Sequence, residues 1–195
     1  ARNIESMGIE FDANAFQSGF SDGINGVKPR LSEAQISEVM KIFQAEMSVK
    51  REARQKLADE STALQSDSNK KQGKDFLSSN KKKPDVVTTV SGLQYRVIRS
   101  GAGIRPNGES TVEVHYVGRL LDGTEFDSSL KRGVPAQFGV TQVIPGWTEA
   151  LQLMREGAKW ELFIPADLAY GPAGQGPIGP NETLVFEVEL LKANI

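Results

Sequence analysis

The sequence contains no cysteine and only one histidine, His115, and this composition excludes several kinds of chemistry. Without cysteine there is no disulfide, no thiol nucleophile and no thiolate ligand for a structural zinc ion. One histidine per chain excludes a metal site built on two histidines, and also a relay of several histidines. The nucleophile elbow GxSxG, the P-loop and the zinc motif HExxH are missing as well. The residues therefore require neither a metal nor a cofactor.

An excess of charge of one sign is also missing, as are long apolar runs. The 23 basic and 25 acidic side chains nearly cancel, which gives no reason to expect a nucleic acid or a polybasic membrane contact. No apolar run reaches the roughly 18 to 20 residues of a spanning helix, so we predict no membrane-spanning segment. An apolar content of 38% in 195 residues suits one large domain or two small ones. We expect the partners to be proteins.

The N-terminal part of the sequence has helical spacing. Phe16 and Phe20 lie four residues apart and would share one side of a helix, which Asn25 and Gly26 would end. Ser32 followed by Gln35 is a capping box that predicts the start of a second helix. This second helix carries one apolar stripe, made of Ile36, Val39, Met40, Phe43 and Met47.

Two short helices offer little cover for such a stripe, so we expect a second copy of the chain to cover it. The prediction is a homodimer formed by a helical module at residues 1–48. Its interface would contain Phe16, Phe20, Ile36, Val39, Met40, Phe43 and Met47. Residues 49–83 stay compatible with helix but are charged nearly all round, which predicts a long connecting helix exposed to solvent. A flexible linker is the alternative for this segment.

After Pro84 the pattern changes to period two, which is typical of strands. Five segments show it: 86–90, 93–98, 111–120, 160–165 and 184–191. Asp122 and Gly123 add a hairpin turn signal, and one short helix is expected at 147–154. Residues 84–195 therefore predict an α+β domain with a small antiparallel sheet folded around a single helix. His115 lies on the strand face opposite Tyr116, and we interpret it as a solvent-facing or a structural histidine rather than a functional one.

The remaining candidates for a site are aromatic and branched residues beside one carboxylate. They are Tyr116, Phe126, Asp127, Phe138, Val143, Ile144, Trp147, Tyr170 and Phe186. From spacing alone, aromatic residues on strands are more often core than site. Both interpretations stay open until the order of the motifs is considered.

Four motifs occur in order: "VEVHYVGRLLDGTEFDSS", "VIPGWTEAL", "LAYG" and "TLVFEVELL". In this order and at these intervals they closely resemble the signature of FKBP-type peptidyl-prolyl cis/trans isomerases, from about residue 86 to residue 195. The whole chain also resembles the bacterial two-domain subgroup that is similar to the macrophage infectivity potentiator (Mip). Members of this subgroup place a helical dimerisation module and a long helix before the isomerase domain.

The resemblance implies an antiparallel half-barrel wrapped around a short helix, with a pocket floored by Trp147. It assigns the walls to Tyr116, Phe126, Phe138 and Phe186, the edge to Val143 and Ile144, and further contacts to Ala169, Ile178 and Arg132. The catalytic set it implies is Asp127, Tyr170, Tyr116, Phe126 and Trp147, and the Ile144 amide is expected to bind a substrate carbonyl. The loop at residues 171–182 looks shorter than in many single-domain relatives.

The function implied is acceleration of X-Pro rotation in folding polypeptides without a metal or cofactor. Tacrolimus and rapamycin would bind in the same pocket, and the dimer would bind clients as a chaperone does. The implied location is the bacterial envelope, in the periplasm or at the outer membrane, with the cytoplasm as the alternative. A binding module that has lost catalysis is the competing interpretation, and a scaffold whose C-terminal domain acts as an adaptor is a third.

Overall fold

The computed structural model describes residues 12–28 and 31–195, and the chain divides into two compact units, Ala1–Lys56 and Leu57–Ile195. We describe each unit by itself. Of the predicted dimerisation module, residues 1–11 and 29–30 lie outside the described residues. Among the described residues no helix is both long enough and apolar enough to cross a bilayer.

The first unit contains helix α2 (Ala13–Ile24) and the start of helix α3 (Glu33–Asn80). Asp12 caps α2, because its Oδ1 accepts hydrogen bonds from two backbone amides of the first turn at 2.9 and 3.0 Å. The predicted capping box of α3 is confirmed: the Ser32 amide donates to Gln35 Oε1 at 2.9 Å, and the Gln35 amide donates to Ser32 Oγ at 3.3 Å.

Among residues 12–28 and 31–195, the apolar side chains that the sequence assigned to a dimer interface are largely exposed. Phe16 and Phe20 stack on each other with ring centroids 6.2 Å apart, and both are more than half exposed. The members of the stripe on α3 that are exposed, between 39% and 55% each, are Ile36, Val39, Met40 and Phe43. Met47 differs, since only 9% of it is exposed. Exposed apolar side chains gathered in this way are typical of an interaction surface.

Helix α3 is continuous over 48 residues and ends at Asn80, three residues before the predicted limit. Asn80 is 1% exposed and donates to Gln94 Oε1 at 3.0 Å, while Gln94 Nε2 donates to the Leu77 carbonyl at 3.0 Å. These bonds join the end of the helix to the sheet of the second unit. The chain then turns at 81–85 into the first strand.

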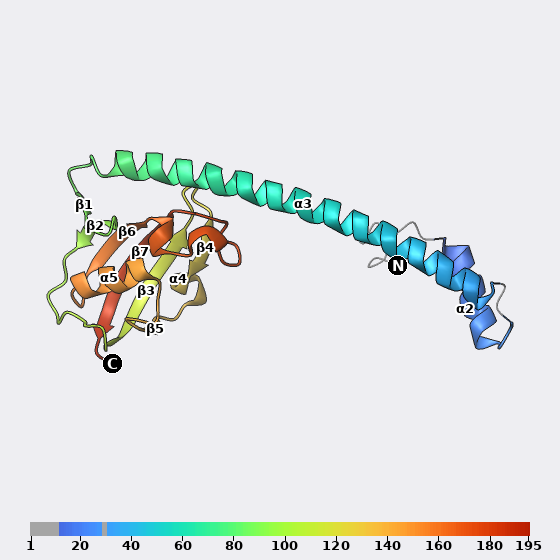
Figure 1. The fold of residues 1–195 in the computed structure, drawn as a ribbon. Coiled ribbons are helices and arrows are strands. Elements are labelled where there is room, and N and C mark those ends of the chain that lie inside the picture. The colour runs from blue at the N-terminus through green and yellow to red at the C-terminus, as the bar shows by residue number, and fades with distance from the viewer. Residues whose placement is uncertain (1–11, 29–30) are drawn as a thin grey trace. The chain divides into compact units, whose positions relative to one another are not determined.

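The second unit contains an antiparallel sheet, seen with the helices in Figure 1. Its strands are β1 (Val86–Thr88), β2 (Gln94–Arg99), β3 (Thr111–Arg119), β4 (Glu125–Ser128), β5 (Ala136–Gly139), β6 (Lys159–Ile164) and β7 (Leu184–Ala193). The order is β1-β2-β6-β7-β3-β4, with β5 paired to the other part of β3. The predicted α+β class, with an antiparallel sheet and one short helix, is confirmed.

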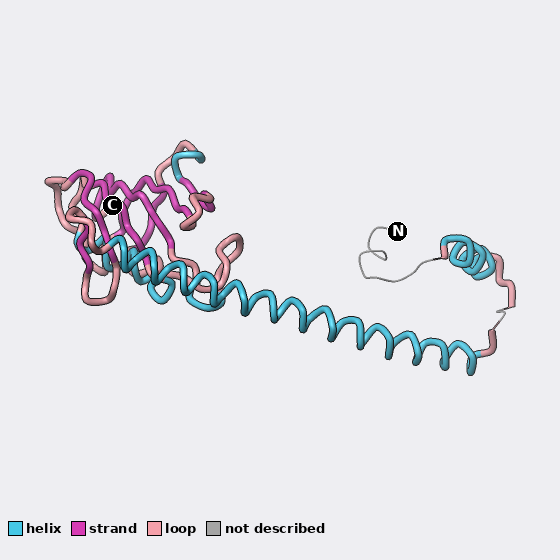
Figure 2. The backbone as a smooth tube through the Cα atoms, turned by 90° about the horizontal axis from the view of Figure 1, so that it is seen from above, coloured by secondary structure: helices cyan, strands magenta, loops and turns pink. Residues whose placement is uncertain are grey.

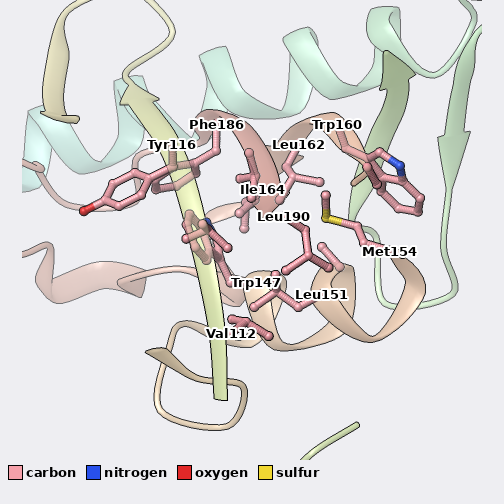
Figure 3. Close-up of a cluster of buried hydrophobic side chains, with 14 of the residues drawn as sticks. Val112, Tyr116, Trp147, Leu151, Met154, Trp160, Leu162, Ile164, Phe186 and Leu190 are labelled. Atoms are coloured by element: carbon pink, nitrogen blue, oxygen red, sulfur yellow. The ribbon is translucent and has the colours of Figure 1, made fainter. Parts of the chain in front are cut away.

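Helix α5 (Pro145–Leu153) lies against this sheet and forms the core with it (Figure 3). Strand β3 buries Val112 and Val114 completely, as its period-two pattern predicts, and α5 adds Leu151. Gly146 allows the close approach of helix and sheet, because a Cβ there would lie 2.5 Å from Ile164 Cγ2. The glycine of the "VIPGW" motif is therefore required by packing.

Candidate active site

A cavity of about 440 Å³ lies between the start of α5 and the sheet. Strands β3, β4, β5 and β7, the segment leading into α5, and the loop after β6 each contribute to it. Its lining consists of Tyr116, Phe126, Asp127, Phe138, Gln142, Val143, Ile144, Trp147, Tyr170, Gln175 and Phe186. Most of these side chains are apolar, and a few polar groups converge among them, as is typical of small-ligand sites.

Trp147, in the first turn of α5, is 4% exposed and contacts three of the other aromatic rings that line the cavity. Three rings meet its indole nearly edge-on. The Tyr116 centroid lies 5.2 Å away at 88°, that of Phe138 lies 5.8 Å away at 86°, and that of Phe186 lies 5.3 Å away at 82°. Edge-to-face geometry of this kind is favourable for aromatic pairs and fixes the ring orientations. Figure 3 shows Trp147, Tyr116 and Phe186 at one end of the core.

The wall on the side of β4 is formed by Phe126 and Phe186, whose ring centroids lie 5.5 Å apart at 85°. Gly118 of β3 lies directly beneath both rings. A Cβ at that position would be 2.7 Å from ring atoms of Phe126 and of Phe186, too close for any side chain to fit without displacing them. The wall therefore depends on a glycine, the second-last residue of β3.

The polar part of the site is a three-residue network. The Tyr116 hydroxyl donates to Asp127 Oδ2 at 2.5 Å, Arg132 Nη2 donates to the Tyr116 hydroxyl at 2.8 Å, and Arg132 Nη1 donates to Asp127 Oδ1. Arg132 comes from the single turn α4 (Ser129–Arg132), which Ser128 caps and which Gly133 ends at φ 73°. The guanidinium also lies 5.4 Å from the centre of the Tyr116 ring.

These contacts set the charge states of the site. Burial favours a neutral Asp127, but the hydrogen bonds from Tyr116 and Arg132 outweigh it and lower the pKa of Asp127 below its ordinary value. Burial and the neighbouring carboxylate raise the pKa of Tyr116, although Arg132 opposes this shift. Burial, followed by the charge of Asp127, also raises the pKa of Tyr170. At neutral pH the site therefore contains one carboxylate and two protonated phenols.

His115 contacts Ser129, the first residue of α4. Its Nδ1 lies 3.0 Å from Ser129 Oγ, and the same hydroxyl accepts a hydrogen bond from the Tyr116 amide at 2.8 Å. Ser129 is completely buried. The interpretation of His115 as a structural histidine is thus confirmed, and the contact helps to hold α4, with Arg132, against β3.

The structure places nine of the predicted site residues around the cavity, and Arg132 bonds to two of them. Ala169 and Ile178 do not line it. Ile178 is 7% exposed and belongs to the core cluster, and its backbone forms an isolated bridge with Gln175. Two lining residues were missed, Gln142 and Gln175. Gln142 directly precedes the "VIPGW" motif, a position that could have indicated it.

Comparison with known proteins identifies the family. The family model described as FKBP-type peptidyl-prolyl cis-trans isomerase matches residues 103–191, and the model for the domain amino-terminal to such isomerases matches residues 1–97. The outer membrane protein MIP of Legionella longbeachae is 48% identical over 192 residues, which cover 97% of this chain and 79% of that protein. The chain belongs to the FKBP-type peptidyl-prolyl cis-trans isomerases.

Further relatives of this isomerase are similar over most of its length. The FKBP-type 22 kDa peptidyl-prolyl cis-trans isomerase of Escherichia coli K12 is 45% identical over 180 residues, covering 91% of this chain and 82% of that protein. The crystal structure of FkpA from Escherichia coli matches with a TM-score of 0.68 at 37% identity, covering 99% of this chain and 87% of that one. The resemblance to FKBP-type and Mip-like proteins that the motifs indicated is confirmed, and so is the predicted enzyme class.

Proposed function

We propose that this isomerase accelerates rotation about X-Pro bonds in folding polypeptides by holding the prolyl ring in the aromatic cavity, with no covalent step. The uncatalysed rotation has a barrier of about 18–20 kcal/mol and takes tens to hundreds of seconds. A catalyst needs only to favour the twisted amide over the planar one. The single observation that carries the proposal is the cavity of about 440 Å³ floored by Trp147, which is large enough for a pyrrolidine ring and its neighbours.

The lining supports a mechanism based on removal of water. A planar amide is charge-separated, and water stabilises it through hydrogen bonds to the carbonyl oxygen. Moving the prolyl ring among Trp147, Phe138 and Phe186 removes that water, which makes twisting easier. The rings that would hold the proline are fixed by their edge-to-face contacts, so little reorganisation is needed on binding.

The polar groups would position the substrate. The Tyr170 hydroxyl lines the cavity, and since its pKa is raised it remains a hydrogen-bond donor for a substrate carbonyl at neutral pH. We assign a similar positioning role to the Ile144 amide. Asp127 keeps its negative charge and bonds to Tyr116 and Arg132, which supports an orienting role together with an electrostatic effect on the rotating carbonyl.

The test is a protease-coupled assay on a short X-Pro peptide. We expect Asp127→Ala and Tyr170→Phe each to lower kcat/KM by about tenfold, the value of a hydrogen bond that involves a charged or positioning group. Asp122→Ala, on an exposed turn, and Tyr95→Phe, which stacks on Trp160 away from the cavity, are the matched controls. Wild-type rates in both site variants would overturn the assignment of the site.

The domain organisation belongs to the same proposal: a dimerisation module at residues 1–48, a connecting helix at 49–83 and the isomerase domain at 84–195. The uncovered side chains on α2 and α3 support pairing of two chains, since they form an apolar surface that a second copy can bury. Two pockets in one dimer could bind the same unfolded polypeptide twice. This would raise the effective concentration of the client without new contacts in either pocket.

The same proposal extends to inhibitors and to location. Tacrolimus and rapamycin are expected to occupy the aromatic cavity and to compete with the peptide. One relative is named an outer membrane protein, and the relatives reported above come from bacteria. We therefore assign this isomerase to the bacterial cell envelope, in the periplasm or at the outer membrane.

A further inference from the structure

The C-terminal half of α3 contacts the loop that joins the η2 turn (Gly171–Ala173) to β7. Asn69 Nδ2 donates to the Pro180 carbonyl at 2.8 Å and to Glu182 Oε1 at 3.0 Å. Asn181 Nδ2 donates to Ser66 Oγ at 2.6 Å. All of these residues belong to the second unit, and Figures 1 and 2 both show this end of α3 alongside the sheet.

The helix and the loop fit together closely. Gly73 is buried, and a Cβ at that position would lie 2.3 Å from Thr183 Oγ1. On the loop side, a Cβ on Gly179 would lie 3.0 Å from Gln65 Nε2. Gly73 thus permits the approach, and the contact at Gly179 is close as well, which indicates a packed contact rather than a chance surface encounter.

Asn181 connects the helix to the catalytic side of the loop. It is 4% exposed and has a φ of 54°, a left-handed conformation that asparagine tolerates better than most residues. Its side chain bonds to Ser66, and its backbone amide donates to the Gly171 carbonyl at 2.8 Å. Gly171 directly follows Tyr170, whose side chain lines the cavity. Two hydrogen bonds and two residues, Asn181 and Gly171, therefore separate the helix from the tyrosine.

The same loop also contains Gln175, which lines the cavity as Tyr170 does. The backbone of Gln175 donates to the Ile178 carbonyl at 2.9 Å, and the Ile178 amide donates back to Gln175 at 3.0 Å. Gly174 and Gly176 adopt φ values of 65° and 56° on either side of Gln175. A loop with these glycines can adopt many conformations, so the position of Gln175 at the cavity depends on how the rest of the loop is held.

We propose that Ser66 and Asn69, which do not line the cavity, are positioning residues of the isomerase: they hold the 171–183 loop so that Tyr170 and Gln175 face the substrate. The inference rests on the pocket proposed above. It assigns a role in catalysis to a helix face that lies in the predicted connecting segment. The helix contact raises the fraction of molecules in which Tyr170 is in place, and its loss lowers kcat/KM by the same factor.

The experiment uses the full chain and the protease-coupled assay. Asn69→Ala removes both of its bonds to the loop and Ser66→Ala removes one, so we expect kcat/KM to fall about two- to tenfold for each. Ser66→Thr keeps the hydroxyl and should restore most of the rate. The matched controls are Ser68→Ala and Gln72→Ala, because Ser68 and Gln72 are exposed and bond to each other. Both controls should keep the wild-type rate.

A double-mutant cycle that combines Asn69→Ala with Tyr170→Phe separates an effect on the position of Tyr170 from a loss of protein stability. If Asn69 acts through the Tyr170 hydroxyl, Asn69→Ala should lower kcat/KM much less in the Tyr170→Phe background than in the wild type. An equal loss in both backgrounds would overturn the inference, and so would Asn69→Ala and Ser66→Ala both matching their controls. If Tyr170→Phe alone has the wild-type rate, the proposed site itself fails, which is a different outcome.

Discussion

Gly118→Ala is the most informative single change, because it adds one methyl group beneath the cavity wall without removing any side chain. The new Cβ would lie 2.7 Å from the rings of Phe126 and Phe186, whereas ordinary contacts begin at 3.4 Å. Each ring would therefore have to recede by about 0.7 Å, and overpacking of this size costs about 1–3 kcal/mol. For a chain of this length the expected fall in Tm is about 2–12 °C.

The effect on catalysis should exceed the effect on folding. A displacement approaching 1 Å in a positioned group can cost about 100-fold in rate, so we expect kcat/KM to fall between about ten- and 100-fold. The matched control is Gly108→Ala, since a Cβ there meets Thr141 Cγ2 at an ordinary 3.7 Å. Both variants are measured in the protease-coupled assay after circular dichroism has verified folding. A Gly118→Ala enzyme with a lower Tm but the kcat/KM of the control would refute the role of this wall.

Two further predictions concern pH and assembly. Burial, followed by the charge of Asp122, raises the pKa of Glu182 in the folded protein. The fold therefore favours the protonated form of Glu182, and the stability gained from this is present below about pH 4.5 and is lost as the pH rises through the folded pKa. Glu182→Gln should therefore raise Tm at pH 7, with a gain that shrinks toward zero below pH 4.5, and a gain independent of pH would contradict this. In sedimentation the full chain should be a dimer, which Phe43→Glu shifts toward monomer while Lys41→Glu, on the other side of the helix, does not. A wild-type monomer would remove the proposed dimer.

Regular elements with a strong local pattern could be predicted from the sequence. The capping box of α3 places its start correctly, because Ser32 and Gln35 bond within one turn. The alternation of Val112 and Val114 along β3 likewise matches their burial. In both cases the determining contacts are local or follow from a simple period, which is why sequence alone suffices.

Elements that depend on distant partners were missed. Strand β5 has four residues, and it is a strand because it pairs with β3, from Thr111 opposite Gly139 to Val114 opposite Ala136. Helix α4 is also four residues long, too short for any helical period, and depends on its cap and on Gly133. Short elements of this kind are specified by tertiary contacts rather than by propensity.

The same distinction applies to the site. The motif order led to the nine cavity residues, whereas the burial of Ile178 in the core was not predicted, because it lies in an irregular loop with positive φ values at Gly174 and Gly176. The role we propose for Asn69 could not be predicted either. It lies in a helix segment charged nearly all round, and its partners are more than 110 positions away in the sequence.

The central claim is that the prolyl ring sits on the Trp147 indole while its amide rotates. Nuclear magnetic resonance of the full chain with an X-Pro peptide tests this directly, through Overhauser contacts between prolyl ring protons and protein side chains under exchange. The account predicts contacts to Trp147 from both the cis and the trans peptide, together with exchange peaks between the two forms. Exchange peaks accompanied by prolyl contacts to a different surface would contradict it.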